Sequence, residues 1–348
     1  MSIHPGDGSS RPAQSGARFG VRIVGSGSAL PERGVTNKDL ESMMETSDEW
    51  IVQRTGIKER RVHTPERGET TASLATIAAS KALKDAGLAP TDLDLILVAT
   101  MTPDSPAPSV ACVVANQLGA GSIGAIDING ACSGFVYSMN LAHDLIKGGS
   151  YRTIAVIGAD TITRHIQFST SGRSTAVLFG DGAACVVVRR TDDPGKGILA
   201  QSMHSDGGGA KYLYIPNRMS DFPEGDAPDE KRLNLVQMNG PAVFKFAVGT
   251  FPKLLEQTLE KAGMSADQVD HFVCHQSNSR ILEAARERFG IAPEKLHVNI
   301  QRFGNTVGAS VPLVFDELRQ AGRVKDGQRV MFLAFGAGLT WGSSLWQL

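Results

Sequence analysis

The stretch around Cys132 places a nucleophilic side chain at a sharp change of structure. A short apolar run breaks at Asn129-Gly130, and a mostly apolar stretch continues to Gly148-Gly149, so we expect a buried strand, a tight turn and a buried helix. Cys132 lies at the turn, where free backbone N–H groups and the helix dipole favour a thiolate and lower the thiol pKa. The pattern makes Cys132 a candidate nucleophile. From this segment alone, however, a small cysteine packed between strand and helix is the more common arrangement.

Two later segments carry groups that could assist such a cysteine. His275, in C-H-Q-S-N, directly follows an apolar run, and functional residues collect at the carboxyl ends of strands in α/β sheets. Asn305 lies between Gly304 and Gly308, which allow close approach of the backbone. Alone, His275 fits a structural hydrogen-bonding role and Asn305 fits a turn. Together with Cys132 and a glycine loop at 336–342 that can present N–H groups to an anion, they fit acyl transfer through a cysteine thioester.

The elements that must position these residues alternate along the chain. Periodicity predicts strands within 21–31, 93–100, 151–159 and 176–189, and helices within 36–55, 70–86 and 241–262. The long polar stretch 204–237 is punctuated by glycine and proline and is predicted to be a lid or a mobile segment. Gly25-x-Gly27 is no nucleotide site, because Pro31 follows where a phosphate-binding helix would begin.

A weak internal repeat predicts two similar halves. Residues 83–98 align without gaps with residues 259–274, and F-G-D-G at 179–182 is echoed by F-G-A-G at 335–338. Each half is then a helix-and-strand layer, and the cleft between the halves is a natural place for a site. We place the halves at 19–193 and 194–348, with a disordered N-terminal tail at 1–18.

Composition excludes several classes of protein. Hydrophobic residues make up 41% of the chain, and the net charge of −1 gives no general affinity for nucleic acid or for an anionic membrane. No apolar run is long enough to span a bilayer, and the first residues contain no apolar core of a signal peptide. The four scattered cysteines argue for a reducing compartment and against disulfides or zinc, so we expect a cytoplasmic location.

The order of the motifs resembles one known family. T-S-D-E-W-I-V-Q-R-T-G-I around Trp50, N-G-A-C-S-G-F, G-R-S-T-A-V-L-F-G-D-G-A, H-Q-S-N, G-N-T-V-G-A-S and F-G-A-G-L-T-W-G occur in this order. Over about residues 20–348 the chain resembles the β-ketoacyl-[acyl-carrier-protein] synthase III family of the thiolase superfamily. The resemblance implies an α/β fold, a five-layered αβαβα sandwich of two duplicated thiolase-like halves. It also implies a homodimer, a tunnel to the site, and no metal or cofactor.

The same resemblance implies a role for each catalytic residue. Cys132 would accept the acyl group of an acyl-CoA primer, with the backbone N–H groups of Cys132 and Ala337 forming the oxyanion hole. His275 and Asn305 would stabilise the enolate formed as malonyl-ACP, the malonyl thioester of the acyl carrier protein, loses CO₂. The product would be 3-oxoacyl-ACP, at the initiation of fatty acid synthesis. Two alternatives remain open: a related acyltransferase or condensing enzyme of a specialised pathway that uses another acceptor, and an inactive member that binds acyl-CoA.

Binding residues follow from the resemblance in the same way. Trp50 and Arg173 would sandwich the CoA adenine with Arg54 near the phosphates, and Asn278 and the backbone of Gly240 would line the pantetheine tunnel. A basic patch of Lys245, Arg280 and Arg288 would bind the acidic carrier protein, although Glu287 weakens it.

The acyl pocket is where the chain departs from the family. Ala107 stands before Pro108, where members that prefer acetyl-CoA often carry a bulky aromatic residue near the end of the pocket. We hypothesise that longer or branched primers fit, with Phe179 and its neighbours setting the remaining limit.

Overall fold

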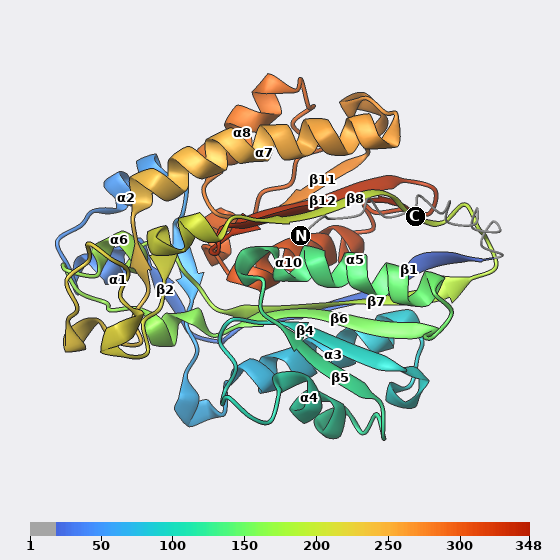
Figure 1. Cartoon of the computed structure of the whole chain (residues 1–348), viewed down its shortest axis with the longest axis horizontal. Coiled ribbons are helices and arrows are strands. Elements are labelled where there is room, and N and C mark those ends of the chain that lie inside the picture. The colour runs from blue at the N-terminus through green and yellow to red at the C-terminus, as the bar shows by residue number, and fades with distance from the viewer. Residues whose placement is uncertain (1–18) are drawn as a thin grey trace, which may run out of the picture.

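The computed structural model describes residues 19–348 and shows five stacked layers (Figure 1). From top to bottom in that view lie a layer of helices, a sheet, a central layer of helices, a second sheet and a further layer of helices. This arrangement confirms the expected αβαβα sandwich. The predicted tail at 1–18 lies outside the described residues.

The first sheet has the strand order β1-β7-β6-β4-β5. Strand β4 runs parallel to both β5 and β6, and β7 runs antiparallel to β6 and β1. Every residue of β4 and β6 is buried, which explains their continuous apolar runs. Helices α3 (Thr71–Ala86) and α4 (Val110–Leu118) cover the outer face. The strands are β1 (Gly20–Ala29), β4 (Leu95–Ala99), β5 (Gly124–Ile128), β6 (Thr153–Asp160) and β7 (Gly182–Thr191).

The second sheet has the order β11-β12-β13-β8. Leu296 makes a parallel bridge to Phe272 of β11, so a further extended segment lies where β5 lies in the first sheet. Helices α7 (Gly240–Ala262) and α8 (Ser279–Arg288) form the outer layer. The strands are β8 (Gly197–Ser205), β11 (His271–Cys274), β12 (Arg329–Gly336) and β13 (Thr340–Gln347).

The repeat found in the sequence matches equivalent elements. Helices α3 and α7 both end at a left-handed glycine, Gly87 and Gly263, which are 176 positions apart (263 − 87). The same offset relates β6 to β12, and it relates the starts of β4 and β11. The two sheets are therefore duplicated halves, whereas the boundary at 193/194 stays a prediction. The similar motifs at 179–182 and 335–338 are not structurally equivalent, because Phe335 lies inside β12 while Phe179 lies in a loop before β7.

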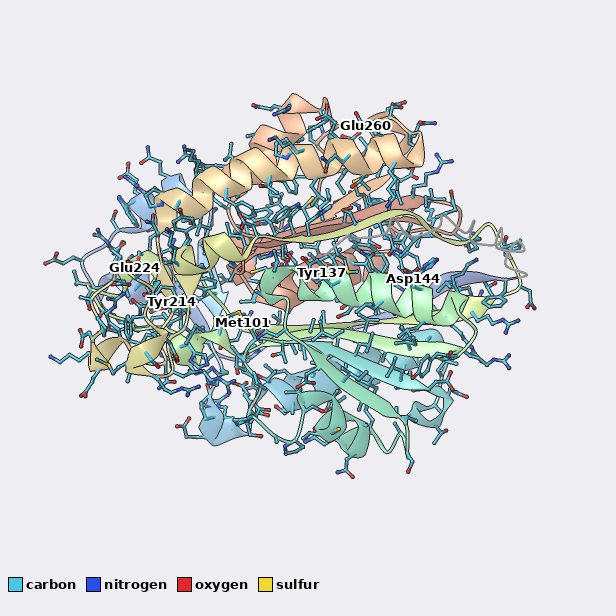
Figure 2. All side chains as sticks on the ribbon, viewed as in Figure 1. Met101, Tyr137, Asp144, Tyr214, Glu224 and Glu260 are labelled. Carbon is cyan, nitrogen blue, oxygen red and sulfur yellow. The ribbon has the colours of Figure 1, made fainter. Side chains whose placement is uncertain are left out.

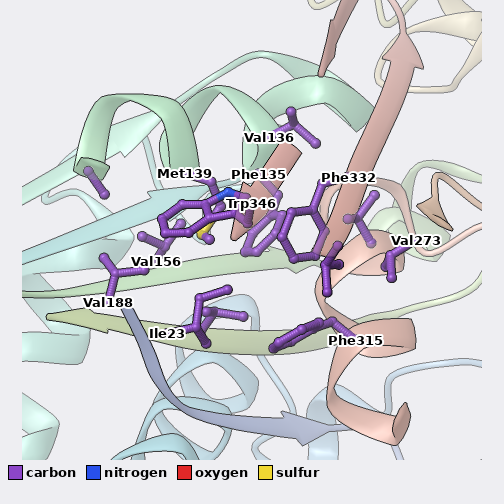
Figure 3. Packing of buried hydrophobic residues seen from close by; sticks show 14 of the residues in the cluster. Ile23, Phe135, Val136, Met139, Val156, Val188, Val273, Phe315, Phe332 and Trp346 are labelled. Atoms are coloured by element: carbon purple, nitrogen blue, oxygen red, sulfur yellow. The ribbon is translucent and has the colours of Figure 1, made fainter. Parts of the chain in front are cut away.

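Two helices fill the space between the sheets. Helices α5 (Gly134–Lys147) and α10 (Ser310–Gln320) contact both sheets, and aromatic side chains lock them in place (Figure 3). The Phe332 ring packs edge-on against Phe135 of α5 at 6.3 Å and against Phe315 of α10 at 5.4 Å. This packing holds both helices between the sheets, and the candidate catalytic turns lead directly into their N-termini.

A cap of short elements closes one end of the sandwich, at the left of Figure 1. The single helix expected over 36–55 is two helices, because Thr36 and Ser47 each cap a separate N-terminus. The cap comprises β2 (Gly34–Thr36), α1 (Asn37–Glu41), α2 (Asp48–Thr55), β3 (Glu59–Arg61), α6 (Arg173–Ala176) and α9 (Ile300–Phe303).

The segment predicted to be a lid is folded over this end. Strand β9 (Leu213–Tyr214) pairs with β10 (Gln237–Met238), and the Asp226 carboxylate binds both Tyr214 and Arg232. His165 anchors the far end, since its carbonyl accepts the Val236 N–H at 2.9 Å. Among residues 19–348, no helix combines the length and apolar character that crossing a bilayer requires.

Candidate active site

A cavity of about 460 Å³ opens beside Cys132, between the sandwich and the lid segment. Its walls are mostly apolar, and they also carry the turn around Cys132 and part of the loop that follows β12. Figure 2 labels two of its residues, Met101 and Tyr214, at the capped end of the molecule. The lining side chains include Met101, Cys132, Ile162, Phe179, Leu213, Ile215, Val236, Val307 and Ala337.

Cys132 lies in the tight turn predicted from the sequence. A short 3₁₀ helix, Ala131–Ser133, leads directly into α5, and Ala131 has a left-handed φ of 46°. A non-glycine residue in this region is strained, and such strain clusters at functional sites. The start of β13 holds the turn from the other side, because Thr340 Oγ1 lies 3.1 Å from the Gly130 carbonyl oxygen and 3.2 Å from the Ser133 hydroxyl.

At the predicted oxyanion hole, the backbone of Gly336 lies close to the backbone of Cys132. A Cβ atom at Gly336 would lie only 2.8 Å from the Cys132 backbone nitrogen, so only glycine fits there. The next residue, Ala337, lines the cavity together with Cys132. The turn and the closing loop therefore bring both predicted N–H donors to one wall of the cavity.

The protonation state of Cys132 differs from the expectation. Burial raises the pKa of the thiol to about 12, and the negative charge of Asp160 adds to the rise. The prediction of a lowered pKa is wrong for the resting protein, because desolvation of a buried thiolate outweighs the favourable helix terminus. Cys132 rests as a thiol, and its proton must leave during acyl transfer.

His275 lies at the end of β11, as expected, and is neutral. Its backbone N–H donates to the Leu333 carbonyl at 2.8 Å, and its ring stands edge-on to Phe335. Complete burial lowers its pKa to about 3. Nδ1 lies 2.6 Å from the Ser310 hydroxyl, which has no other hydrogen-bond acceptor within residues 19–348. If Ser310 donates to Nδ1, the imidazole proton is on Nε2, and we assign that tautomer.

Hydrogen bonds fix the orientation of the Asn305 side-chain amide. Its backbone forms a parallel bridge with Phe179, and its Oδ1 accepts the Val307 N–H at 2.9 Å. The amide NH₂ is therefore left as the donor for a ligand. Val307 has a φ of 52°, a second strained residue beside a catalytic candidate.

The three segments meet at one end of the sandwich. The turn containing Cys132 contacts the 3₁₀ helix Val307–Ala309, which follows Asn305 and continues into α10 at Ser310, the partner of His275. His275 and Asn305 are buried and do not line the cavity, whereas Cys132 and Val307 do. The structure thus gathers the predicted catalytic residues from three distant segments.

Three of the predicted CoA-binding residues, Trp50, Arg54 and Arg173, form a linked group on the cap. The guanidinium carbons of Arg54 and Arg173 each lie 4.9 Å from the centre of the Trp50 ring. An adenine placed between Trp50 and Arg173 would have to displace Arg173 from the ring. Asn278 caps α8 and donates to the Arg54 carbonyl at 2.9 Å, while Gly240 begins α7, and neither lines the cavity.

The predicted carrier-protein patch is exposed on the outer helices. Lys245 lies on α7, and Arg280 and Arg288 lie on α8. The Arg280 guanidinium sits over the ring of Phe244, which is 38% exposed, so the surface is both basic and apolar. Glu287, which is expected to weaken the patch, is exposed on the same helix.

The two residues assigned to the acyl pocket lie apart. Phe179 lines the cavity, but Ala107 lies on an exposed loop and does not reach the cavity of its own chain. The cause is Asp104, whose carboxylate accepts the Thr71 and Ala72 N–H groups and draws the loop toward α3. A small residue at 107 therefore does not enlarge the cavity within a single chain.

Some residues of the site were missed in the sequence. The cavity walls from the lid were not predicted, and neither were Ser310 and Asp160, which hold the two catalytic turns. Asp160 directly follows the predicted strand 151–159, so its position at a strand end was an available signal. Among the described residues, no cluster of three or more histidine, cysteine or acidic side chains could hold a metal.

The fold and the site together define a thiolase-like condensing enzyme. The model of 3-oxoacyl-[acyl-carrier-protein (ACP)] synthase III matches residues 126–207, and the model of its C-terminal part matches residues 259–348. The β-ketoacyl-[acyl-carrier-protein] synthase III of Caldanaerobacter subterraneus is 46% identical over 328 residues, covering 94% of this chain and 98% of the relative. The chain therefore belongs to the β-ketoacyl-[acyl-carrier-protein] synthase III family.

Solved structures agree with this assignment. The crystal structure of 3-oxoacyl-[acyl-carrier-protein] synthase III from Aquifex aeolicus superimposes with a TM-score of 0.86 at 41% identity, covering 94% of this chain and all of the other. The priming β-ketosynthase of the R1128 polyketide pathway gives a TM-score of 0.87 at 32% identity, covering 97% and 99% of the two chains.

Proposed function

We propose that this protein condenses an acyl-CoA primer with malonyl-ACP to give 3-oxoacyl-ACP. The observation that carries the proposal is the strained turn of Cys132 packed against the turn that follows Asn305, with His275 bonded to Ser310 at the end of that turn. Membership of the family supports it. Both thioesters are substrates, so this chemistry needs no cofactor.

The first step transfers the acyl group to the enzyme. The Cys132 sulfur attacks the thioester carbonyl, and the negative oxygen of the tetrahedral intermediate accepts the N–H groups of Cys132 and Ala337. The carbon–sulfur bond to CoA then breaks, and the thiol proton ends on the CoA sulfur. Because Cys132 is a buried thiol before the reaction, the protein does not have to stabilise a buried thiolate.

The second step forms the carbon–carbon bond. Malonyl-ACP loses CO₂, and the resulting enolate oxygen accepts hydrogen bonds from His275 Nε2–H and from the Asn305 amide. The nucleophilic carbon attacks the acyl-Cys132 carbonyl in the same oxyanion hole, and collapse releases 3-oxoacyl-ACP. The Cys132 thiolate then takes up a proton. Neutral His275 and uncharged Asn305 both remain donors near neutral pH.

Primer preference is the first test, and we expect chains longer than acetyl to be used. Acylation rates with acetyl-, isobutyryl- and octanoyl-CoA would be compared, because the apolar cavity of about 460 Å³ has room for the longer chains. Val236→Phe fills the cavity and is expected to lower the octanoyl rate about 10-fold relative to acetyl. Strict acetyl preference in the wild type would contradict the proposal for the primer.

Carrier-protein docking gives a second prediction. The double change Lys245→Glu and Arg280→Glu is expected to raise the KM for malonyl-ACP about 10-fold at low salt, since it reverses charges that attract an acidic partner. The KM for acyl-CoA should not change. Lys84→Glu, an exposed change on α3 at the opposite outer layer, is the matched control. An equal rise of both KM values would refute the patch.

We further propose a homodimer that forms through β5. This strand is the edge of its sheet, and Ile126 within it is 50% exposed. The loop carrying Ala107 leads into α4, whose first N–H groups bond Asp127 of β5, so the loop would meet the partner. Sedimentation should give twice the mass of one chain, and Ile126→Lys should give one chain mass. A monomeric wild type would contradict the dimer.

A specialised pathway is the second candidate, supported by the likeness to a priming polyketide synthase. In that case the acyl-enzyme would form, but malonyl-ACP of fatty acid synthesis would not be consumed. A cytoplasmic location fits either candidate, given four cysteines without disulfides.

A further inference from the structure

Asp160 is a buried carboxylate for which the steps above have no use. It lies at the end of β6 with only 1% of its surface exposed. Its Oδ1 lies 2.9 Å from the Met101 nitrogen, 2.9 Å from Thr102 Oγ1 and 3.2 Å from Thr100 Oγ1. Its Oδ2 lies 3.1 Å from the Gly308 nitrogen. An isolated buried charge is costly, so this set of bonds calls for an explanation.

Every one of these partners donates to Asp160. Thr100 Oγ1 accepts the Thr102 N–H at 3.1 Å, and Thr102 Oγ1 accepts the Thr161 N–H at 3.0 Å, which leaves both hydroxyl protons for the carboxylate. A carboxyl group that receives four donors has no acceptor for a proton of its own. Burial raises the pKa of Asp160 only to about 6, and the donors hold it down, so the group is ionised at neutral pH.

The carboxylate ties together segments that wall the active site. Met101 and Val307 both line the cavity, and Asp160 binds the N–H of Met101 and of Gly308, the residue after Val307. Two successive N–H groups of this turn thus form hydrogen bonds with different partners. The Val307 N–H orients the Asn305 amide, and the Gly308 N–H is held by Asp160.

The turn of Val307 and Gly308 has a strained shape that its neighbours must hold. Val307 keeps a φ of 52°, and a β-branched residue in this region needs surrounding bonds to hold it. The backbone of β6 lies directly beneath, since a Cβ at Gly158 would come 2.2 Å from the Gly308 carbonyl oxygen. Asp160 therefore fastens the turn from the strand that already contacts it.

We propose that Asp160 is a positioning residue for the condensation step, whose ionised carboxylate holds the Val307–Gly308 turn so that the Asn305 amide points at the enolate. This inference rests on the proposed function. It assigns Asp160 no contact with either substrate and no role in acylation.

The negative charge of Asp160 shows that this residue does not activate Cys132. A negative charge near Cys132 raises the thiol pKa and so opposes thiolate formation. Removing the charge should leave acylation of Cys132 unchanged or faster and should slow only the step that uses Asn305. A residue that merely stabilises the fold would affect both half-reactions alike.

The test separates the two half-reactions in Asp160→Asn. The added amide NH₂ would face N–H donors, so the turn loses its anchor although the side chain keeps its size. We expect acylation from acyl-CoA to stay within about threefold, and condensation of the pre-acylated enzyme with malonyl-ACP to fall about 10²-fold, as a misplaced group can cost. Equal losses in both half-reactions, or no loss in condensation, would overturn the proposal.

Two further variants complete the experiment. Asp316→Asn is the matched control, because Asp316 is a buried carboxylate that binds Ser26 and Gln320 at 2.7 and 3.2 Å and does not contact the site. It should leave the ratio of the two rates unchanged. If Asp160→Asn does not fold, Thr102→Val removes one donor and should give a smaller split of the same sign. Failure of the wild type to condense malonyl-ACP would instead count against the proposed function.

Discussion

Replacing Cys132 with serine is expected to abolish acyl transfer from acyl-CoA. A hydroxyl at this position is far less acidic than a thiol, and the site offers it no base, because neutral His275 carries its proton on Nε2 in the assigned tautomer. We expect kcat for the complete reaction to fall on the order of 10⁴-fold or more, as when the nucleophile of a covalent mechanism is lost. Transfer of label from acyl-CoA to protein measures this directly.

The control for this variant is Cys112→Ser. Cys112 is a free and exposed cysteine on α4, so its replacement should leave the rate and the labelling unchanged. Both variants should keep the melting temperature close to that of the wild type, since each change is nearly isosteric. Full activity in Cys132→Ser, or loss of labelling in Cys112→Ser, would refute the assignment of the nucleophile.

Replacing Asn305 with alanine is expected to stop condensation while acylation continues. The amide NH₂ is left free by the Val307 N–H bond to Oδ1, so its loss removes one of two donors to the enolate. A single donor of this kind is worth about 10²- to 10³-fold in kcat. Condensation would be followed by release of CO₂ from malonyl-ACP, and acylation by the mass of the acyl-enzyme.

The pattern of losses is the decisive part of this prediction. Asn305→Ala should accumulate acyl-enzyme that malonyl-ACP does not discharge. Asn116→Ala changes an exposed asparagine on α4 and should behave as the wild type does. A variant of Asn305 that condenses at the normal rate would show that His275 alone stabilises the enolate, contrary to the account given above.

The sequence was sufficient for the fold, and it singled out candidate catalytic residues whose segments the structure brings together. The repeat of 83–98 at 259–274 reports real equivalence, because helix ends, caps and strands recur at one offset in the structure. The candidates Cys132, His275 and Asn305 could be singled out because each lies at the end or start of a regular element, where local pattern is informative.

Properties that depend on distant neighbours could not be predicted from local pattern. The pKa of Cys132 is set by burial and by Asp160, and the sequence around the turn indicated the opposite shift. Ala107 is drawn away by the bond of Asp104 to α3, which involves a residue more than thirty positions away. The lid walls of the cavity depend on the pairing of β9 with β10 and on His165.

The central claim is that Cys132 carries the acyl group as a thioester. The most direct measurement is mass spectrometry of the protein after incubation with octanoyl-CoA, followed by mapping of the modified peptide. The account predicts one added octanoyl group per chain on the peptide that contains Cys132, and its removal when malonyl-ACP is supplied. An unmodified Cys132 peptide, or an acyl group on Cys112, Cys185 or Cys274, would contradict it.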